Sequence, residues 1–182
     1  SAHMACFNVS PLERKLAVGL GIPIYGCDPD LLHLGSKSGA RRVFREAGLP
    51  LADGYEDLTD ANQVATALAA LKSRNPNLRR AVVKLNEGFS GEGNAIFRFD
   101  GAPGGTALEP WVKARLPNLA FAAQDMQWED FEAKITQMGA IAEEFIEGTA
   151  PRTPSVQLRV DPTGDLSVIS THDQIVDDRS GQ

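Results

Sequence analysis

The sequence predicts an α+β fold, in which helices and strands alternate along the chain. Three observations support this prediction. Val64, Leu68 and Leu71 recur at the spacing of one face of a helix. Residues 94–99 alternate between two sets of side chains, as a half-buried strand does. Farther along, "SVQLRV" and "LSVIST" flank a turn sequence at residues 161–165, which is typical of a β-hairpin.

Capping residues indicate where further helices begin and end. Ser36 can cap a helix that Gly48 ends. Thr106 and Glu109 match a capping box, which predicts the start of a helix that Pro117 stops. These signals divide the chain into short segments of the size found in small mixed domains.

The clearest amphipathic stripe consists of Trp128, Phe131, Ile135 and Met138. Core packing is the ordinary explanation for such a stripe, so we expect a helix that covers the core. Strands are predicted at residues 80–85 and 140–146. The stretch "LAVGLGIPIYG", residues 16–26, fits a short strand and the end of a helix equally well.

Composition excludes several classes of protein. The chain has 182 residues, a net charge of −6 and 42% hydrophobic residues. An acidic chain of this kind is not expected to bind nucleic acid or a membrane surface. No apolar run approaches the ~20 residues that cross a bilayer. Cys6 and Cys27 form no disulfide or zinc pattern, which favours a reduced, cytoplasmic protein.

The stretch "AVVKLNEGFSGEGNAIFRF" places Lys84 at the end of an apolar strand, before a glycine-rich connection to a second strand. Glycine weakens a sheet, so a connection this rich in glycine needs a reason. One explanation is a loop whose backbone N–H groups close over phosphate oxygens, with Lys84 nearby. The other is an ordinary long hairpin, and the loop alone does not decide between them.

Three familiar glycine-rich loops do not fit this stretch. Walker and Rossmann loops lead from a strand into a helix, whereas this loop leads into a second strand. A protein-kinase loop joins two strands, but its lysine follows the loop, whereas Lys84 precedes it. The pattern that remains is a lysine followed by a glycine-rich hairpin.

Two neighbouring stretches suggest that this loop belongs to a binding site. Lys37 falls in the first turn of a predicted helix, where a cation opposes the helix dipole. It is either a solvated lysine or one that reaches a ligand. The stretch "AIAEEFIEG" is either a charged strand end or a hinge whose backbone and glutamates contact a nucleobase, with Phe145 and Ile146 beside the ring.

The order of these motifs resembles the ATP-grasp superfamily, and most closely its pheganomycin-type peptide ligases. The residues that carry the resemblance are "DPDLLHLGSKSGARRVFREAGLP", "VVK" with the glycine-rich hairpin, "EEFIEG" and "STHDQ". The resemblance covers residues 24–182 and implies an ATP-grasp fold. The nucleotide contacts that it implies are Lys37, Lys84, Gly88, Phe89, Ser90, Gly91, Gly93, Glu143, Glu144, Phe145 and Ile146.

The resemblance implies a ligase that joins a carboxylate to an amine through an acyl phosphate, with ATP and Mg²⁺ as cofactors. Its substrates would be small molecules or peptides. A ribose-binding acid is expected soon after Gly148, but residues 149–152 offer none. The family's magnesium carboxylates follow the "STHDQ" strand, and no matching motif precedes the end at "DDRSGQ". We therefore expect an inactive fragment of a longer ligase, with no catalytic or metal-binding side chain assigned.

The resemblance also implies a division of the chain. Residues 1–4, "SAHM", are typical of a cloning remnant, and residues 5–35 would end a preceding domain. Residues 36–148 would form the central nucleotide-binding subdomain, and 149–182 the truncated start of the C-terminal one. An incomplete fold exposes strand edges and apolar surface, which predicts self-association. The alternative is a nucleotide-binding or scaffolding module that never carried metal carboxylates.

Overall fold

The fold is organised around a sheet in which all neighbouring strands are antiparallel. A computed structural model describes residues 2–88, 93–148, 152–161 and 164–175. The sheet has the strand order β3-β7-β4-β5-β6. Its members are β3 (Gly54–Leu58), β4 (Arg80–Leu85), β5 (Asn94–Arg98), β6 (Ala120–Phe121) and β7 (Ala140–Glu144). The α+β prediction is therefore confirmed.

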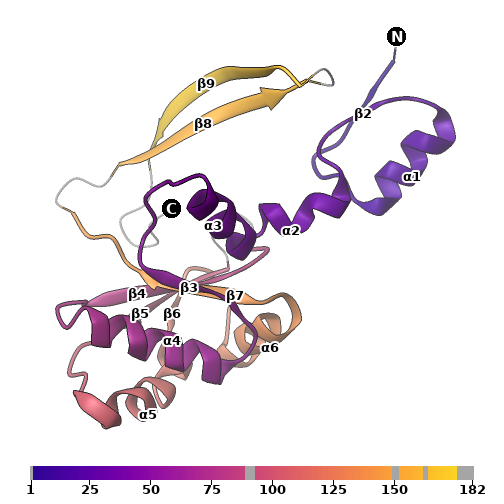
Figure 1. The fold of residues 1–182 in the computed structure, drawn as a ribbon. Helices are drawn as coiled ribbons and strands as arrows, with labels where there is room; N and C mark the ends of the chain where they lie inside the picture. The colour runs from indigo at the N-terminus through magenta and orange to yellow at the C-terminus, as the bar shows by residue number, and fades with distance from the viewer. Residues whose placement is uncertain (1, 89–92, 149–151, 162–163, 176–182) are drawn as a thin grey trace.

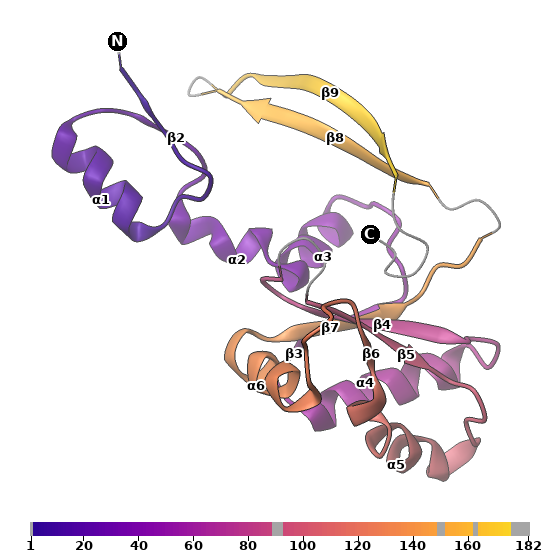
Figure 2. The same cartoon turned by 180° about the vertical axis from the view of Figure 1, so that it is seen from behind.

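The two faces of this sheet are covered differently. Three helices lie on one face, α4 (Ala61–Arg74), α5 (Leu108–Lys113) and α6 (Trp128–Met138), as Figures 1 and 2 show. On the other side lie α3 (Lys37–Glu46) and a separate hairpin of β8 (Thr153–Val160) and β9 (Leu166–Gln174). The second face is thus only partly covered.

The N-terminal part of the chain forms a small unit before α3. It contains β1 (Met4–Ala5), α1 (Pro11–Leu20), β2 (Ile24–Tyr25), a 3-10 turn (Pro29–Leu31) and α2 (Leu32–Gly35), and β1 pairs with β2 in parallel. The stretch at residues 16–26 that fitted two structures contains both of them. Helix α1 ends at Gly21, whose φ of 64° reverses the chain into β2.

The core lies between the sheet and its three helices. Phe131 and Ile135 of the predicted stripe are fully buried, and Trp128 and Met138 pack against the core at its margin. On β5, Ala95 and Phe97 are buried, whereas Arg98 is exposed. The helical and strand periodicities read from the sequence therefore point at one shared core.

The predicted capping box at Thr106 and Glu109 is wrong. Thr106 lies inside a 3-10 turn (Gly105–Ala107), and α5 starts only at Leu108. The carboxylate of Glu109 instead accepts a hydrogen bond of 2.6 Å from the hydroxyl of Thr66 on α4. Helix α5 ends at Lys113, so Pro117 does not stop it as predicted. Pro117 is the second residue of another 3-10 turn (Leu116–Asn118). Glu109 therefore joins α5 to α4 and does not cap a helix, as the local pattern had predicted.

None of the helices in the described part is long and apolar enough to span a membrane. Large apolar side chains do remain exposed on the hairpin. Antiparallel pairing places Leu158 opposite Val168 and Val160 opposite Leu166, so these four side chains share one face. Each is between 57% and 65% exposed.

Candidate functional site

Lys84 and Glu143 meet on the sheet face that α3 partly covers. Val83 and Leu85 point into the core and are almost fully buried, so the strand period places Lys84 on the opposite face. Glu143 lies on the neighbouring strand β7, two residues from the direct partner of Lys84, and its Oε1 is 2.5 Å from the Lys84 Nζ. The side chain of Lys84 remains 28% exposed. The predicted position of Lys84 on the strand face opposite Val83 and Leu85 is confirmed, whereas its predicted orientation toward the loop is not shown, since its Nζ is bound by Glu143.

Lys37 reaches the same region from α3. Its Nζ donates a hydrogen bond of 3.3 Å to the carbonyl oxygen of Gly88, at the start of the glycine-rich loop. Burial lowers the pKa of Lys37 below its ordinary value; the charge of Lys84 lowers it further, while Glu143 acts in the opposite direction. Burial is the main cause and the charge of Lys84 adds to it, so an anion placed beside these two lysines would favour the charged form of Lys37.

Asn86 fixes the helix that carries Lys37. Its Oδ1 accepts hydrogen bonds from the backbone N–H and the hydroxyl of Ser38, at 3.0 and 2.8 Å. Its Nδ2 donates to the carbonyl of Met138, at 3.0 Å, and its own carbonyl accepts from the N–H of Lys37. Through its side chain and backbone, Asn86 thus ties the start of α3 to the end of β4 and to the end of α6. No local sequence pattern indicated this role.

Two glycines set the base of the loop. A Cβ on Gly88 would lie 2.8 Å from the Cα of Gly93, and a Cβ on Gly93 would lie 3.0 Å from the Cα of Gly88. The carbonyl of Gly93 also accepts a 2.9 Å hydrogen bond from the N–H of Leu85. These glycines are therefore needed because two backbone segments pass in contact. The predicted contacts Phe89, Ser90 and Gly91, and any statement about the order of the loop, lie outside the described residues.

Asn94 lies opposite Lys84 on β5 and therefore shares its face of the sheet. Within the described part of the chain, its Oδ1 is buried and has no hydrogen-bond partner. Buried polar atoms nearly always have one, so an N–H or O–H donor is missing at this point. Val82 and Ile96 are paired two residues farther along the same two strands, so they lie on the same face and give it an apolar floor. None of these three residues was predicted from the sequence. The alternation of side chains along a strand could have indicated them, because it places Val82 on the same face as Lys84, and Asn94 and Ile96 together on one face of the next strand.

The predicted hinge residues lie at the end of β7 and directly after it. The side chain of Glu143 is only 13% exposed and is bound by two cations, Lys84 and Arg41. The carboxylate of Glu144 accepts from the N–H of Asp53, at 3.2 Å. Of the two glutamates, Glu143 therefore belongs to the lysine cluster, whereas Glu144 braces the strand end.

Phe145 and Ile146 continue this segment. The N–H of Phe145 donates to the carbonyl of Arg80, at 3.1 Å, and its ring lies 4.1 Å from the Arg80 guanidinium. The side chain of Ile146 is 74% exposed. A cavity of about 320 Å³ lies beside this segment, lined by Asn75, Asn77, Leu78, Arg79, Glu144, Phe145, Ile146 and Glu147.

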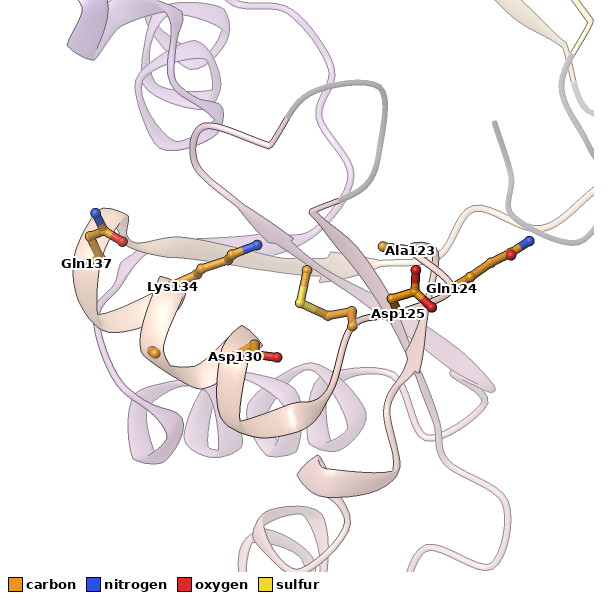
Figure 3. Close-up of a pocket in the computed structure, with 8 residues that line it drawn as sticks. Ala123, Gln124, Asp125, Asp130, Lys134 and Gln137 are labelled. Atoms are coloured by element: carbon orange, nitrogen blue, oxygen red, sulfur yellow. The ribbon is translucent and has the colours of Figure 1, made fainter.

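A larger hollow of about 590 Å³ lies elsewhere, along α6 and the segment before it (Figure 3). Asp125 and Lys134 contribute charged groups to it, and none of the predicted site residues lines it. It is therefore separate from the face that carries Lys84.

Among the residues that the structure describes, there is no group of three or more His, Cys, Asp or Glu side chains that could hold a metal ion. Lys37 and Lys84 bring two positive charges to one place, and Lys can bind a phosphate group as a point charge.

Comparison with known proteins agrees with these features. A family profile described as IQCH-like, ATP-grasp matches residues 29–100. The chain is 28% identical over 174 residues to L-propargylglycine–L-glutamate ligase of Streptantibioticus cattleyicolor, covering 93% of this chain and 34% of the ligase. It is 25% identical over 192 residues to IQ motif-containing protein H of Danio rerio, covering 90% of this chain and 18% of that protein. The chain therefore spans about a third or less of each relative.

Solved structures show the same fold. D-alanyl-alanine synthetase A of Vibrio cholerae superposes with a TM-score of 0.55 at 14% identity, over 90% of this chain and 41% of that one. The ADP complex of N5-carboxyaminoimidazole ribonucleotide synthetase superposes with a TM-score of 0.53 at 14% identity, over 90% of this chain and 35% of that one. The chain therefore contains part of the ATP-grasp fold, and its residues 29–100 match an ATP-grasp family profile.

Proposed function

We propose that this chain is the nucleotide-binding part of an ATP-dependent ligase that joins a carboxylate to an amine. The observation that carries the proposal is the convergence of Lys37 and Lys84 beside the base of the glycine-rich loop. The relative from Streptantibioticus cattleyicolor is named as a ligase of two amino acids, which supports this substrate class. The carboxylate and the amine would be small molecules or peptides, and the protein would act in the cytoplasm.

Each group on the open sheet face has a role in this proposal. Lys37 and Lys84 hold the phosphates, because two cations in a partly desolvated place attract them strongly. Val82 and Ile96 pack against the base, as apolar residues line most nucleotide pockets. Asn94 Oδ1 accepts a hydrogen bond from an N–H or O–H group of the nucleotide. The segment from Glu144 to Ile146 borders the base, and the loop residues Phe89, Ser90 and Gly91 would close over the phosphates.

The proposed reaction has two steps. A carboxylate oxygen attacks the γ-phosphorus of ATP, the bond to ADP breaks, and an acyl phosphate forms. An amine nitrogen then attacks the acyl carbon, the bond to phosphate breaks, and the amine loses a proton. The protein forms no covalent bond, so its contribution is to position the reactants and stabilise charge. Magnesium would supply further charge neutralisation, but no described residue is assigned to it.

Nucleotide titration of the 182-residue chain tests the binding part of the proposal. ADP and adenosine are compared by the backbone amide shifts of Gly93 and Asn94 in a labelled protein. We expect ADP to bind more tightly than adenosine, with a dissociation constant on the order of 1 mM in the absence of metal carboxylates. Lys84→Ala should weaken the binding of ADP and leave the affinity for adenosine unchanged. Equal affinities for ADP and adenosine, or no saturable binding of ADP, would contradict the proposal.

The second candidate is a nucleotide-binding or scaffolding module without catalysis. It is favoured by the IQCH-like description of the matching family. The product of the full reading frame that contains these residues separates the two functions. The ligase should release phosphate only when ATP, a carboxylic acid and an amine are all present. A module would bind ADP without any release of phosphate.

We also propose a division of the chain that corresponds to the subdomains of the ATP-grasp fold. Residues 36–148 would be the central nucleotide-binding subdomain, preceded by the end of another domain at residues 5–35. Residues 149–182 would begin the C-terminal subdomain. Limited proteolysis checks this division, because cleavage should concentrate near residues 35 and 149.

A further inference from the structure

Arg41 lies one helical turn after Lys37, on the same side of α3. It is a charged residue with only 6% of its surface exposed, and charged residues are almost never buried to this extent unless they are paired. No contact with a ligand is required to explain it, because its neighbours in the protein already use its donors.

Arg41 uses all sides of its guanidinium. Its Nη1 donates to Glu143 Oε2 at 2.6 Å, its Nε donates to Glu56 Oε1 at 3.2 Å, and its Nη2 donates to the carbonyl of Ala52 at 3.0 Å. Three bonds from one planar group hold it in a single orientation. The carboxylate of Glu143, in turn, is held at one fixed place beside the sheet.

Glu143 is shared between two cations. Its Oε2 faces Arg41, while its Oε1 lies 2.5 Å from the Nζ of Lys84. Glu56 has a further partner in Arg45, so the loss of Arg41 would not leave Glu56 alone. Without Arg41, the full negative charge of Glu143 would act on Lys84, and it would compete with any phosphate for that lysine.

We propose that Arg41 is a positioning residue that occupies Glu143 and thereby keeps Lys84 available for the phosphates of a nucleotide. This inference rests on the proposed nucleotide-binding function. Arg41 itself touches no phosphate; it acts through Glu143. The consequence is that the effect of Arg41 on nucleotide affinity depends on the presence of Glu143.

A double-mutant cycle tests that dependence. ADP affinity is measured by amide shifts for the 182-residue chain and for its Arg41→Gln, Glu143→Gln and doubly substituted variants. We expect Arg41→Gln to weaken ADP binding at least about fivefold when Glu143 is present, and by less than about twofold in the Glu143→Gln background. The matched control is Arg42→Gln, which removes an exposed charge from the same helix and should leave ADP affinity unchanged. Equal losses in both backgrounds would overturn the proposal.

Arg41→Lys guards against a variant that does not fold. Lysine keeps the positive charge but cannot form the same set of hydrogen bonds. Arg41→Lys should therefore weaken ADP binding less than Arg41→Gln does, and this weakening should also vanish in the Glu143→Gln background. A loss that persists in that background would show a purely structural role for Arg41.

A separate readout distinguishes failure of this inference from failure of the proposed function. Unfolding free energies in urea are measured for Arg41→Gln, Lys84→Gln and the double variant, with and without Glu143. Arg41 and Lys84 each bind a different oxygen of Glu143, so the non-additivity of their effects should be largest while Glu143 links them. If the chain does not bind ADP, the proposed function fails. If the changes in unfolding free energy caused by the Arg41 and Lys84 substitutions are additive in both backgrounds, the proposed link through Glu143 is wrong.

Discussion

The Nζ of Lys84 lies 2.5 Å from Oε1 of Glu143, although the two residues are 59 positions apart in the chain. The pairing of β4 with β7 brings them together, since Val82 is the direct partner of Glu143. The lysine at the end of "VVK" and the first glutamate of "EEFIEG" therefore belong to one cluster. This relation gives the first prediction its target.

Lys84→Ala should slow phosphate release by the product of the full reading frame. Loss of one electrostatic contact to a reacting group costs about 3 kcal/mol, which is roughly a hundredfold in rate. The control is Trp128→Phe, since Trp128 packs at the margin of the core and should leave turnover per folded molecule nearly unchanged. Circular dichroism checks folding. A folded Lys84→Ala protein that releases phosphate at the parental rate would show that Lys84 does not hold the nucleotide.

Gly93→Ala should destabilise the base of the loop. Its new Cβ would lie 3.0 Å from the Cα of Gly88 and 3.1 Å from the Cβ of Leu85, in a buried place. Crowding of this kind typically costs about 1–3 kcal/mol in the free energy of unfolding. Gly104→Ala is the matched control, because nothing lies within 4 Å of its added Cβ. Urea unfolding measures both variants, and equal stabilities would refute the close packing of Gly88 and Gly93.

Lys37 should make stability depend on pH in the alkaline range. Its pKa in the folded protein is lowered from the ordinary 10.5, chiefly by burial and then by Lys84. Between the folded pKa and 10.5 the unfolded chain binds more protons, so stability rises with pH in that window. Below the folded pKa the cost of burying the charge is fully present.

The measurement for this prediction is a comparison with Lys37→Gln. The difference in unfolding free energy between Lys37→Gln and the unaltered protein should shrink as the pH rises toward 10.5, because the buried charge is lost. The other ionisable groups are common to both proteins and cancel in this difference. A difference that stays constant with pH would show that Lys37 is not perturbed.

The β8–β9 hairpin should cause weak self-association. Leu158, Val160, Leu166 and Val168 form an exposed apolar face on a pair of strands, and such faces favour contact between copies. Leu158→Ser with Val168→Ser should shift sedimentation velocity toward the monomer. Gln157→Ser, one residue away and on the other face of the strand, is the control. If the unaltered chain sediments as a monomer at high concentration, this prediction is wrong.

The sequence determined the secondary structure of most of the chain. Helix α3 begins after Ser36, whose hydroxyl accepts a hydrogen bond from the N–H of Gly39, and the hairpin turns where the turn residues predicted it. The stripe of α6 faces the core. These features depend on residues that are close in sequence, and local propensity and periodicity describe such residues well.

Only the tertiary structure decided which charges share a site. Arg41 and Asn86 have no distinctive local pattern, because their partners are brought together by the packing of α3 against the sheet. The failed capping box has the same origin, since Glu109 is bound by Thr66 of another helix. Sequence spacing specifies which face of an element a side chain occupies; long-range packing specifies what that side chain meets there.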